Sequence, residues 1–200
     1  MLVDRTLTPL TVRQMAGVLA TVRGELSTVA LENILAIAAL ENGNGKKIVQ
    51  HNWGNVMATE AWRAKHDFWE RKDPTVKPRF FRAYPSHAQG AEAFLKLLQS
   101  SRHQGAVGAA QADDTGAMVD SLFASAYVVP VPAAQHSRGL SAAEQQAEYS
   151  GAVRSIREKF RSTKPFGQLS QGELGPGAAV AAGVFIVLAG LGLYRFWGAR

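Results

Sequence analysis

Apolar residues recur at helical spacing along most of the chain, and the clearest run precedes a segment rich in glycine and asparagine. Ser27 is placed to cap the start of this helix. Asn42-Gly43 ends it, because both residues tolerate the left-handed conformation that a helix C-cap needs. The pattern therefore predicts a core helix that ends at Glu41. Its apolar face is formed by Leu31, Ile34, Leu35 and Ala38.

Four further stretches repeat this spacing, and each opens with a helix start signal. The signals are Thr8-Pro9, the capping box of Ser86 and Gln89, Asp113 or Asp114, and the capping box of Ser141 and Glu144. The stretch from Val56 to Arg82 is broken by prolines instead, and it ends in a strand-like run. Part of it, Thr59–Arg71, could alternatively be helical. The chain is therefore expected to be mainly α.

The character of the chain changes after residue 162. We expect a domain over residues 1–162, a linker over 163–177 and one transmembrane helix over 178–197, since the last stretch is uncharged until Arg195 and long enough to cross a bilayer. Tyr194 and Trp197 fit an interfacial aromatic belt. Small residues at four-residue spacing suggest helix association, with a second copy or with virion proteins. The alternative is a buried helix of a soluble domain.

Composition narrows the classes of partner. The net charge is +6, which favours anionic partners, but the basic residues are scattered and no nucleic-acid-binding motif is present. We therefore expect no nucleic acid. The chain has no cysteine, so disulfides, thiolate metal sites and a cysteine nucleophile are excluded. No further signal points to a cofactor. Residues 1–8 lack the apolar run of a secretory signal.

Glu41 is the first candidate for chemistry. It follows Ala38 by three residues, so it lies on the apolar stripe at the C-terminal end of the helix. Burial disfavours the ionised form of a carboxyl group and raises its pKa. A carboxyl group that keeps its proton near neutral pH can act as a general acid. The alternative interpretation is a glutamate at a frayed helix end.

The segment after Glu41 is a candidate ligand-binding loop. Its three glycines and three asparagines argue against regular structure. Asn52 and Asn55 offer amides to the polar groups of a ligand. Trp53 offers either a stacking face for a ligand or a plug for the small core beneath the loop. His51 is interpreted as a solvated loop residue, since no second ligand stands at metal-binding spacing, and we expect no metal site.

Three short motifs occur in a fixed order. The first is A-L-E-N-G-N-G, ending at Gly45, the second is N-W-G-N-V from Asn52, and the third is F-F-R-A-Y-P-S-x-x-x-G, ending at Gly90. In this order they resemble the lysozyme-like peptidoglycan hydrolases, closest to the endo-β-N-acetylglucosaminidase family that includes flagellar-rod muramidases and many phage wall hydrolases. The resemblance covers roughly residues 25 to 160, including Tyr149. It implies a lysozyme-like fold with a small β flap over one side of a cleft.

The resemblance also implies roles for individual residues. Glu41 takes the position of the catalytic acid. A second carboxylate is implied in the flap region, where Glu60 is the best match and Asp67 and Glu70 are weaker ones. Tyr127 takes the place of a tyrosine near the acid, with an amphipathic core tyrosine as the alternative. The family's T-D-P that usually follows is missing here.

The resemblance implies an enzyme that cleaves the glycan strand of peptidoglycan, as an N-acetylglucosaminidase, a muramidase or a lytic transglycosylase. Two carboxyl groups would allow ordinary hydrolysis. With Glu41 alone, attack by the sugar's own 6-hydroxyl or assistance by the 2-acetamido group remains. The C-terminal helix would anchor the chain in a virion membrane or the bacterial inner membrane, with the catalytic domain facing the cell wall, in a bacteriophage component. The rival is a non-catalytic, membrane-anchored virion or wall-binding protein with the same fold.

Overall fold

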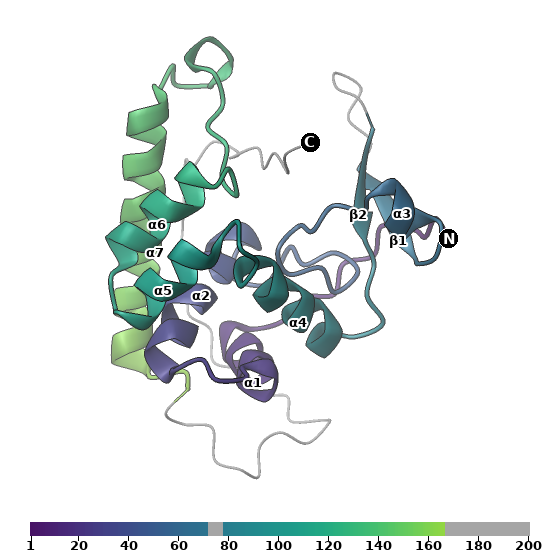
Figure 1. The fold of residues 1–200 in the computed structure, drawn as a ribbon, viewed down its shortest axis with the longest axis horizontal. Helices are drawn as coiled ribbons and strands as arrows, with labels where there is room; N and C mark the ends of the chain where they lie inside the picture. The colour runs from purple at the N-terminus through teal and green to yellow at the C-terminus, as the bar shows by residue number, and fades with distance from the viewer. Residues whose placement is uncertain (72–77, 167–200) are drawn as a thin grey trace.

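The computed structural model describes residues 1–71 and 78–166 and is mainly helical (Figure 1). Within these ranges one antiparallel sheet of two strands interrupts the helices. The elements are α1 Val12–Val22, α2 Thr28–Glu41, α3 Glu60–Arg63, β1 Phe68–Arg71, β2 Arg79–Arg82, α4 His87–Leu98, α5 Gln104–Gln111, α6 Thr115–Ala124, the 3-10 turn η1 Ala133–Gln135, and α7 Ala142–Thr163. The expected mainly α fold with a small β flap is confirmed.

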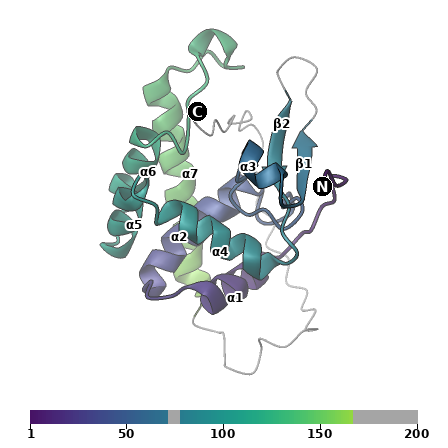
Figure 2. The ribbon, with the colours of Figure 1, turned by 45° about the vertical axis from the view of Figure 1, so that its right-hand side comes forward.

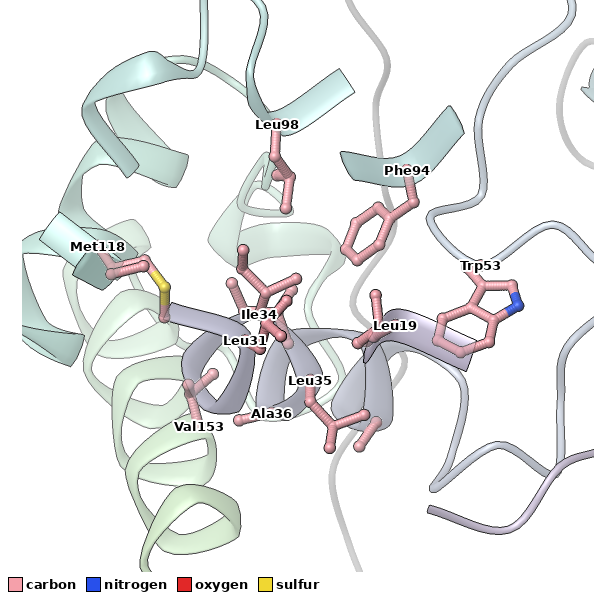
Figure 3. Packing of buried hydrophobic residues seen from close by; sticks show 14 of the residues in the cluster. Leu19, Leu31, Ile34, Leu35, Ala36, Trp53, Phe94, Leu98, Met118 and Val153 are labelled. Atoms are coloured by element: carbon pink, nitrogen blue, oxygen red, sulfur yellow. The ribbon is translucent and has the colours of Figure 1, made fainter. Parts of the chain in front are cut away.

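Helix α2 is the centre of the core, and it is more deeply buried than a one-sided stripe predicts. Ala36 and Ile37 are as completely buried as the predicted face, because α1, α5 and α7 all pack on this helix. A helix that is apolar all round is one that neighbours surround. Figure 3 shows its side chains meeting Leu19 of α1, Phe94 of α4 and Val153 of α7.

Most predicted helix starts are confirmed, and one is wrong. Ser27, Ser86 and Ser141 each accept a backbone hydrogen bond as N-caps. Thr8-Pro9 does not start a helix, however: α1 begins at Val12, with Thr11 as its N-cap. Residues 2–10 are instead extended along other parts of the chain, and the Thr8 amide donates to the carbonyl of Ile48 at 2.8 Å. Pairing of this backbone with the loop after α2 competes with helix formation.

The flap is the unit formed by α3, β1 and β2, called the hairpin unit below. Trp69 pairs with Phe81 across the two strands, and their rings stack with centroids 4.6 Å apart. These rings form a second small core together with Val49 and Ala83. The N-terminal segment adds a bridge from Leu2 to Phe68. Figure 2 shows the hairpin unit on one side of the molecule, with α5, α6 and α7 on the other.

The C-terminal predictions concern a part of the chain beyond this description. Helix α7 ends at Thr163, one residue past the predicted domain boundary. Residues 167–177 of the predicted linker and the whole of the predicted transmembrane helix at 178–197 lie outside the described residues. Among the helices that are described, none combines the length and the apolar character required to cross a membrane.

Candidate active site

Glu41 is the last residue of α2, and the chain around it is fixed by backbone-directed hydrogen bonds. The side-chain amide of Asn42, almost fully buried, donates to the carbonyls of Ala38 at 2.9 Å and of Trp53 at 2.5 Å. The first bond closes the helix end, and the second ties it to the following loop. Gly45 has a φ of +83°, and a Cβ there would lie 2.1 Å from the carbonyl oxygen of Leu10. Glycine is therefore required where the loop meets the N-terminal segment.

The two oxygens of the Glu41 carboxyl group have different environments. Oε1 accepts a hydrogen bond of 2.7 Å from the Tyr149 hydroxyl of α7. Oε2 is shut off from solvent and has no hydrogen-bond partner among the described residues. Burial raises the pKa of Glu41 to about 8, and the bond from Tyr149 opposes part of that rise. Glu41 therefore holds a proton at neutral pH, as the sequence analysis expected of a general acid.

A second tyrosine lies within electrostatic reach of Glu41. Tyr127 follows α6 and is 8% exposed, and its ring meets that of His103 edge to face. Burial raises the pKa of the Tyr127 hydroxyl well above its usual value, and a negative charge on Glu41 raises it further. Tyr127 therefore stays protonated beside the carboxyl group. The structure thus brings together Glu41 and Tyr127, two of the predicted site residues.

The sequence did not predict the contact of Tyr149 with Glu41, although the family resemblance includes Tyr149. Tyr149 is fully buried on α7, on the same face as Val153, Ile156 and Phe160. The available signal was chemical: a buried tyrosine hydroxyl requires a partner. A tyrosine on a core face therefore points to a polar group on a facing helix. Here that group is Glu41.

Asn52 and Trp53 stabilise the loop instead of facing outward. Asn52 is 1% exposed; its side chain accepts from the amide of Val56 and donates to the carbonyls of Val56 and Arg82. These bonds join the loop to strand β2 and occupy the amide that was expected to meet the ligand, a sugar by the family resemblance. Trp53 is 0% exposed and packs in the main core (Figure 3), so it is the plug of the two roles considered, not a stacking face.

The other two predicted site residues are placed nearer the surface. Asn55 is half-buried, with a φ of 49°. Glu60 is exposed at the first position of α3, in the hairpin unit, away from the helix that carries Glu41. Of the weaker carboxylate candidates, Asp67 binds the N-terminal ammonium group at 3.1 Å, and Glu70 is half-buried in β1. All three flap carboxylates thus lie in or beside the hairpin unit.

His51 has a neighbour that its sequence context did not reveal. Its ring lies 4.5 Å from that of His87, at the start of α4, and its Nδ1 contacts the carbonyl oxygen of Tyr84 at 2.6 Å. His87 Nδ1 accepts from the Trp53 indole N–H at 3.2 Å. Burial, with help from His51, lowers the pKa of His87 to about 4, so it is neutral and Nδ1 stays an acceptor. The described residues hold no group of three or more metal-ligating side chains.

The large aromatic residues of the hairpin unit pack on one another. Trp62 stacks on His66 with ring centroids 4.1 Å apart, and the guanidinium group of Arg82 lies 4.2 Å from the centre of the Trp62 ring. Phe68 meets Phe80 edge to face across the strands. These contacts hold the short hairpin together beside its own small core. They involve neither Glu41 nor its two tyrosines.

Comparison with known proteins identifies the fold. No family model matches the chain, and neither does any curated protein. Among solved structures, the glycoside hydrolase domain of FlgJ from Salmonella typhimurium is similar, with a TM-score of 0.54 and 20% identity over 78% of this chain and 91% of that one. A peptidoglycan hydrolase from Sphingomonas sp. A1 has a TM-score of 0.50 and 18% identity over 86% and 94%. The chain therefore shares the fold of these two hydrolases.

Proposed function

We propose that this protein cleaves the glycan strand of peptidoglycan, with Glu41 as the general acid. The observation that carries the proposal is the Glu41 carboxyl group itself, which is buried, holds its proton to about pH 8 and is fixed by the Tyr149 hydroxyl. Support comes from the fold, which is shared with a FlgJ glycoside hydrolase domain and with a peptidoglycan hydrolase. The order of the three sequence motifs supports the same activity.

The geometry at Glu41 indicates which oxygen carries the proton. Tyr149 donates to Oε1, so the proton of the neutral acid resides on Oε2. The substrate must first displace the groups that cover Oε2. As the glycosidic bond breaks, the proton on Oε2 then passes to the leaving sugar oxygen and Glu41 becomes a carboxylate. The Tyr149 hydroxyl then donates to a charged acceptor, and such hydrogen bonds are the stronger ones. The contact therefore stabilises the acid after it has given up its proton.

Three routes for the rest of the reaction stay open in this proposal. Glu60, supplied by the hairpin unit, is our candidate for a second carboxylate that activates water or attacks the sugar, with Asp67 and Glu70 as weaker candidates. If no second carboxylate takes part, the 6-hydroxyl group or the 2-acetamido group of the sugar itself attacks the reacting carbon. We also propose that Asn55 and Tyr127 contact the sugar. Asn55 is half-buried in the loop that follows Glu41, and Tyr127 is within electrostatic reach of Glu41.

Our proposal for the cellular setting rests on sequence alone. The apolar run at 178–197, uncharged until Arg195, would anchor the chain in a virion membrane or the bacterial inner membrane, and the catalytic domain would face the cell wall. A bacteriophage component that degrades the wall locally fits this arrangement. Purified particles that lack the protein would refute the virion setting, and recovery of the full chain in a soluble fraction would refute the anchor.

Digestion of purified peptidoglycan tests the activity and the route together. Wild type and Glu41→Gln are incubated with the substrate and the products are read by mass spectrometry. We expect muropeptides from wild type only. Ends in 1,6-anhydro-muramic acid would identify a lytic transglycosylase, and reducing N-acetylglucosamine would identify a glucosaminidase. No release by either protein, with both folded by circular dichroism, would refute the enzyme and favour the wall-binding alternative.

A further inference from the structure

The two tyrosines at Glu41 bracket one segment of the chain. Tyr127 follows the end of α6 by three residues, and Tyr149 lies two turns into α7. The chain therefore leaves the neighbourhood of Glu41 at Tyr127 and returns to it at Tyr149. Both ends of the segment 127–149 therefore lie near the proposed acid.

One buried amide clamps the base of this segment. Gln145 is 0% exposed; its Oε1 accepts from the amide of Val131 at 2.8 Å, and its Nε2 donates to the carbonyls of Val131 at 2.6 Å and Leu140 at 2.8 Å. A single side chain thus holds both ends of the loop 131–140. Gln145 also precedes Tyr149 by one helical turn on the same face of α7, so the clamp lies about 6 Å along the helix from the Glu41 contact.

Between its clamped ends the loop 131–140 is largely exposed. Figures 1 and 2 show it extending beyond the N-terminal end of α7, while the hairpin unit rises on the other side of the molecule. Its contacts are local: the amide of Arg138 donates to His136 Nδ1, and the Arg138 side chain pairs with Glu148 of α7. A loop without a core of its own depends on the clamp for its position. The exposed residues are Pro132, Ala133, Ala134, Gln135, Ser137, Arg138 and Gly139.

We propose that the loop 131–140 is a binding wall for the glycan strand beyond the bond that is cut, and that Gln145 is the positioning residue that holds it. This inference rests on the proposed function. The base of the loop is held by Gln145, one helical turn from the Tyr149 contact with Glu41. The loop extends from there beyond the N-terminal end of α7, which suits a ligand longer than the reacting sugars. Gln135, His136 and the exposed peptide groups can donate to and accept from sugar hydroxyls and acetamides. The wall should therefore strengthen the binding of long strands more than that of short ones.

The test uses the full chain and peptide-free glycan strands, prepared from peptidoglycan with an amidase, as a tetrasaccharide and as long strands. Gln145→Leu removes the clamp, and the double variant of the exposed Gln135 and the half-buried His136, Gln135→Ala with His136→Ala, alters the wall outside the core. We expect KM for long strands to rise about 3- to 10-fold, the effect of losing one or two hydrogen bonds. We expect kcat, and both constants for the tetrasaccharide, to change less than twofold. Gln111→Ala, exposed on α5, is the matched control.

Binding measurements separate this inference from the proposed activity. Dissociation constants for the same strands are measured in the Glu41→Gln background, where no cleavage is expected. Weaker binding of long strands by both wall variants supports the wall even if wild type releases no product. Unchanged long-strand binding and KM in the double variant, or a loss of kcat and tetrasaccharide turnover equal to the loss on long strands, would overturn it. Failure of every form to bind any strand would overturn it as well.

Discussion

The hydroxyl of Tyr149 donates to Glu41 Oε1 at 2.7 Å, and this bond joins residues 108 positions apart in the chain. It connects the end of the most buried helix to the longest one. Burial raises the pKa of the Glu41 carboxyl group and the bond from Tyr149 lowers it, with a net value of about 8. The balance between these two effects decides the pH range in which Glu41 can donate a proton, and several measurable consequences follow from it.

The two tyrosine-to-phenylalanine variants should differ in their pH profiles. Tyr149→Phe removes the hydrogen bond that lowers the pKa of Glu41, so the alkaline limb of kcat/KM should move above its wild-type position near pH 8. Tyr127→Phe removes a hydroxyl that is neutral over this range, so the limb should stay where it is. The measurement is the rate of peptidoglycan solubilisation against pH. Equal profiles for both variants would contradict the assigned role of Tyr149.

Glu41 should make the folded state less stable as the pH rises. Its pKa is about 8 in the folded protein and 4.5 for an ordinary, solvated glutamate, so the unfolded chain releases the proton first. Its contribution is fully present below about pH 4.5 and is lost towards pH 8, at about 1.4 kcal/mol for each pKa unit. Urea unfolding of wild type and Glu41→Gln across this range measures the difference. The variant should gain in relative stability by a few kcal/mol at pH 8, and a constant difference would contradict the buried, protonated acid.

Substitution of Asn52 should lower the stability of the fold, whereas substitution of Asn55 should weaken substrate binding. Asn52→Ala leaves the buried Val56 amide without its acceptor and removes one donor each from the carbonyls of Val56 and Arg82, so the free energy of unfolding should fall by about 1–3 kcal/mol. Asn55→Gly preserves the left-handed backbone and should instead raise KM at nearly unchanged stability. Thermal unfolding and steady-state kinetics of both variants check this. A raised KM for Asn52→Ala at wild-type stability would return Asn52 to the substrate.

Gly90 should be required for the close packing of α4 against the loop after α2. A Cβ at this position would lie 1.7 Å from the carbonyl oxygen of His51, which is backbone that cannot swing aside. Gly90→Ala should therefore destabilise the protein by about 1–3 kcal/mol or more. Gly108→Ala is the matched control, because its Cβ meets nothing within 4 Å in a helix and should stabilise by up to about 1 kcal/mol. Denaturant midpoints of the two variants should move in opposite directions.

The sequence predicted those elements whose signals are local. Ser27, Ser86 and Ser141 cap their helices because the cap bond joins residues three apart. Thr8-Pro9 failed for the complementary reason: its segment pairs with Ile48, a partner 40 positions away that no local pattern reveals. The small hairpin was expected from the family resemblance, since its four-residue strands are too short to show a period of two.

For the candidate site, too, local signals could be predicted from the sequence and long-range contacts could not. Glu41 could be found because its place on an apolar stripe implies burial. Tyr149 could not, because its contact depends on how α7 packs against α2. Residue type assigned Asn52 to ligand binding and left Trp53 open between a stacking face and a core plug. The fold uses Asn52 for loop hydrogen bonds and Trp53 for core volume. Residue type in a loop indicates what a side chain can do, and only packing decides whether it faces a ligand.

The most direct test of the central claim is the rate of muropeptide release from peptidoglycan by wild type and Glu41→Gln, measured from about pH 5 to about pH 10. We expect release by wild type that declines with a midpoint near pH 8, as Glu41 loses its proton. We expect no release by Glu41→Gln at any pH, with circular dichroism showing the same fold. Equal release by the two proteins, or wild-type activity that rises through pH 8, would contradict Glu41 as the acid.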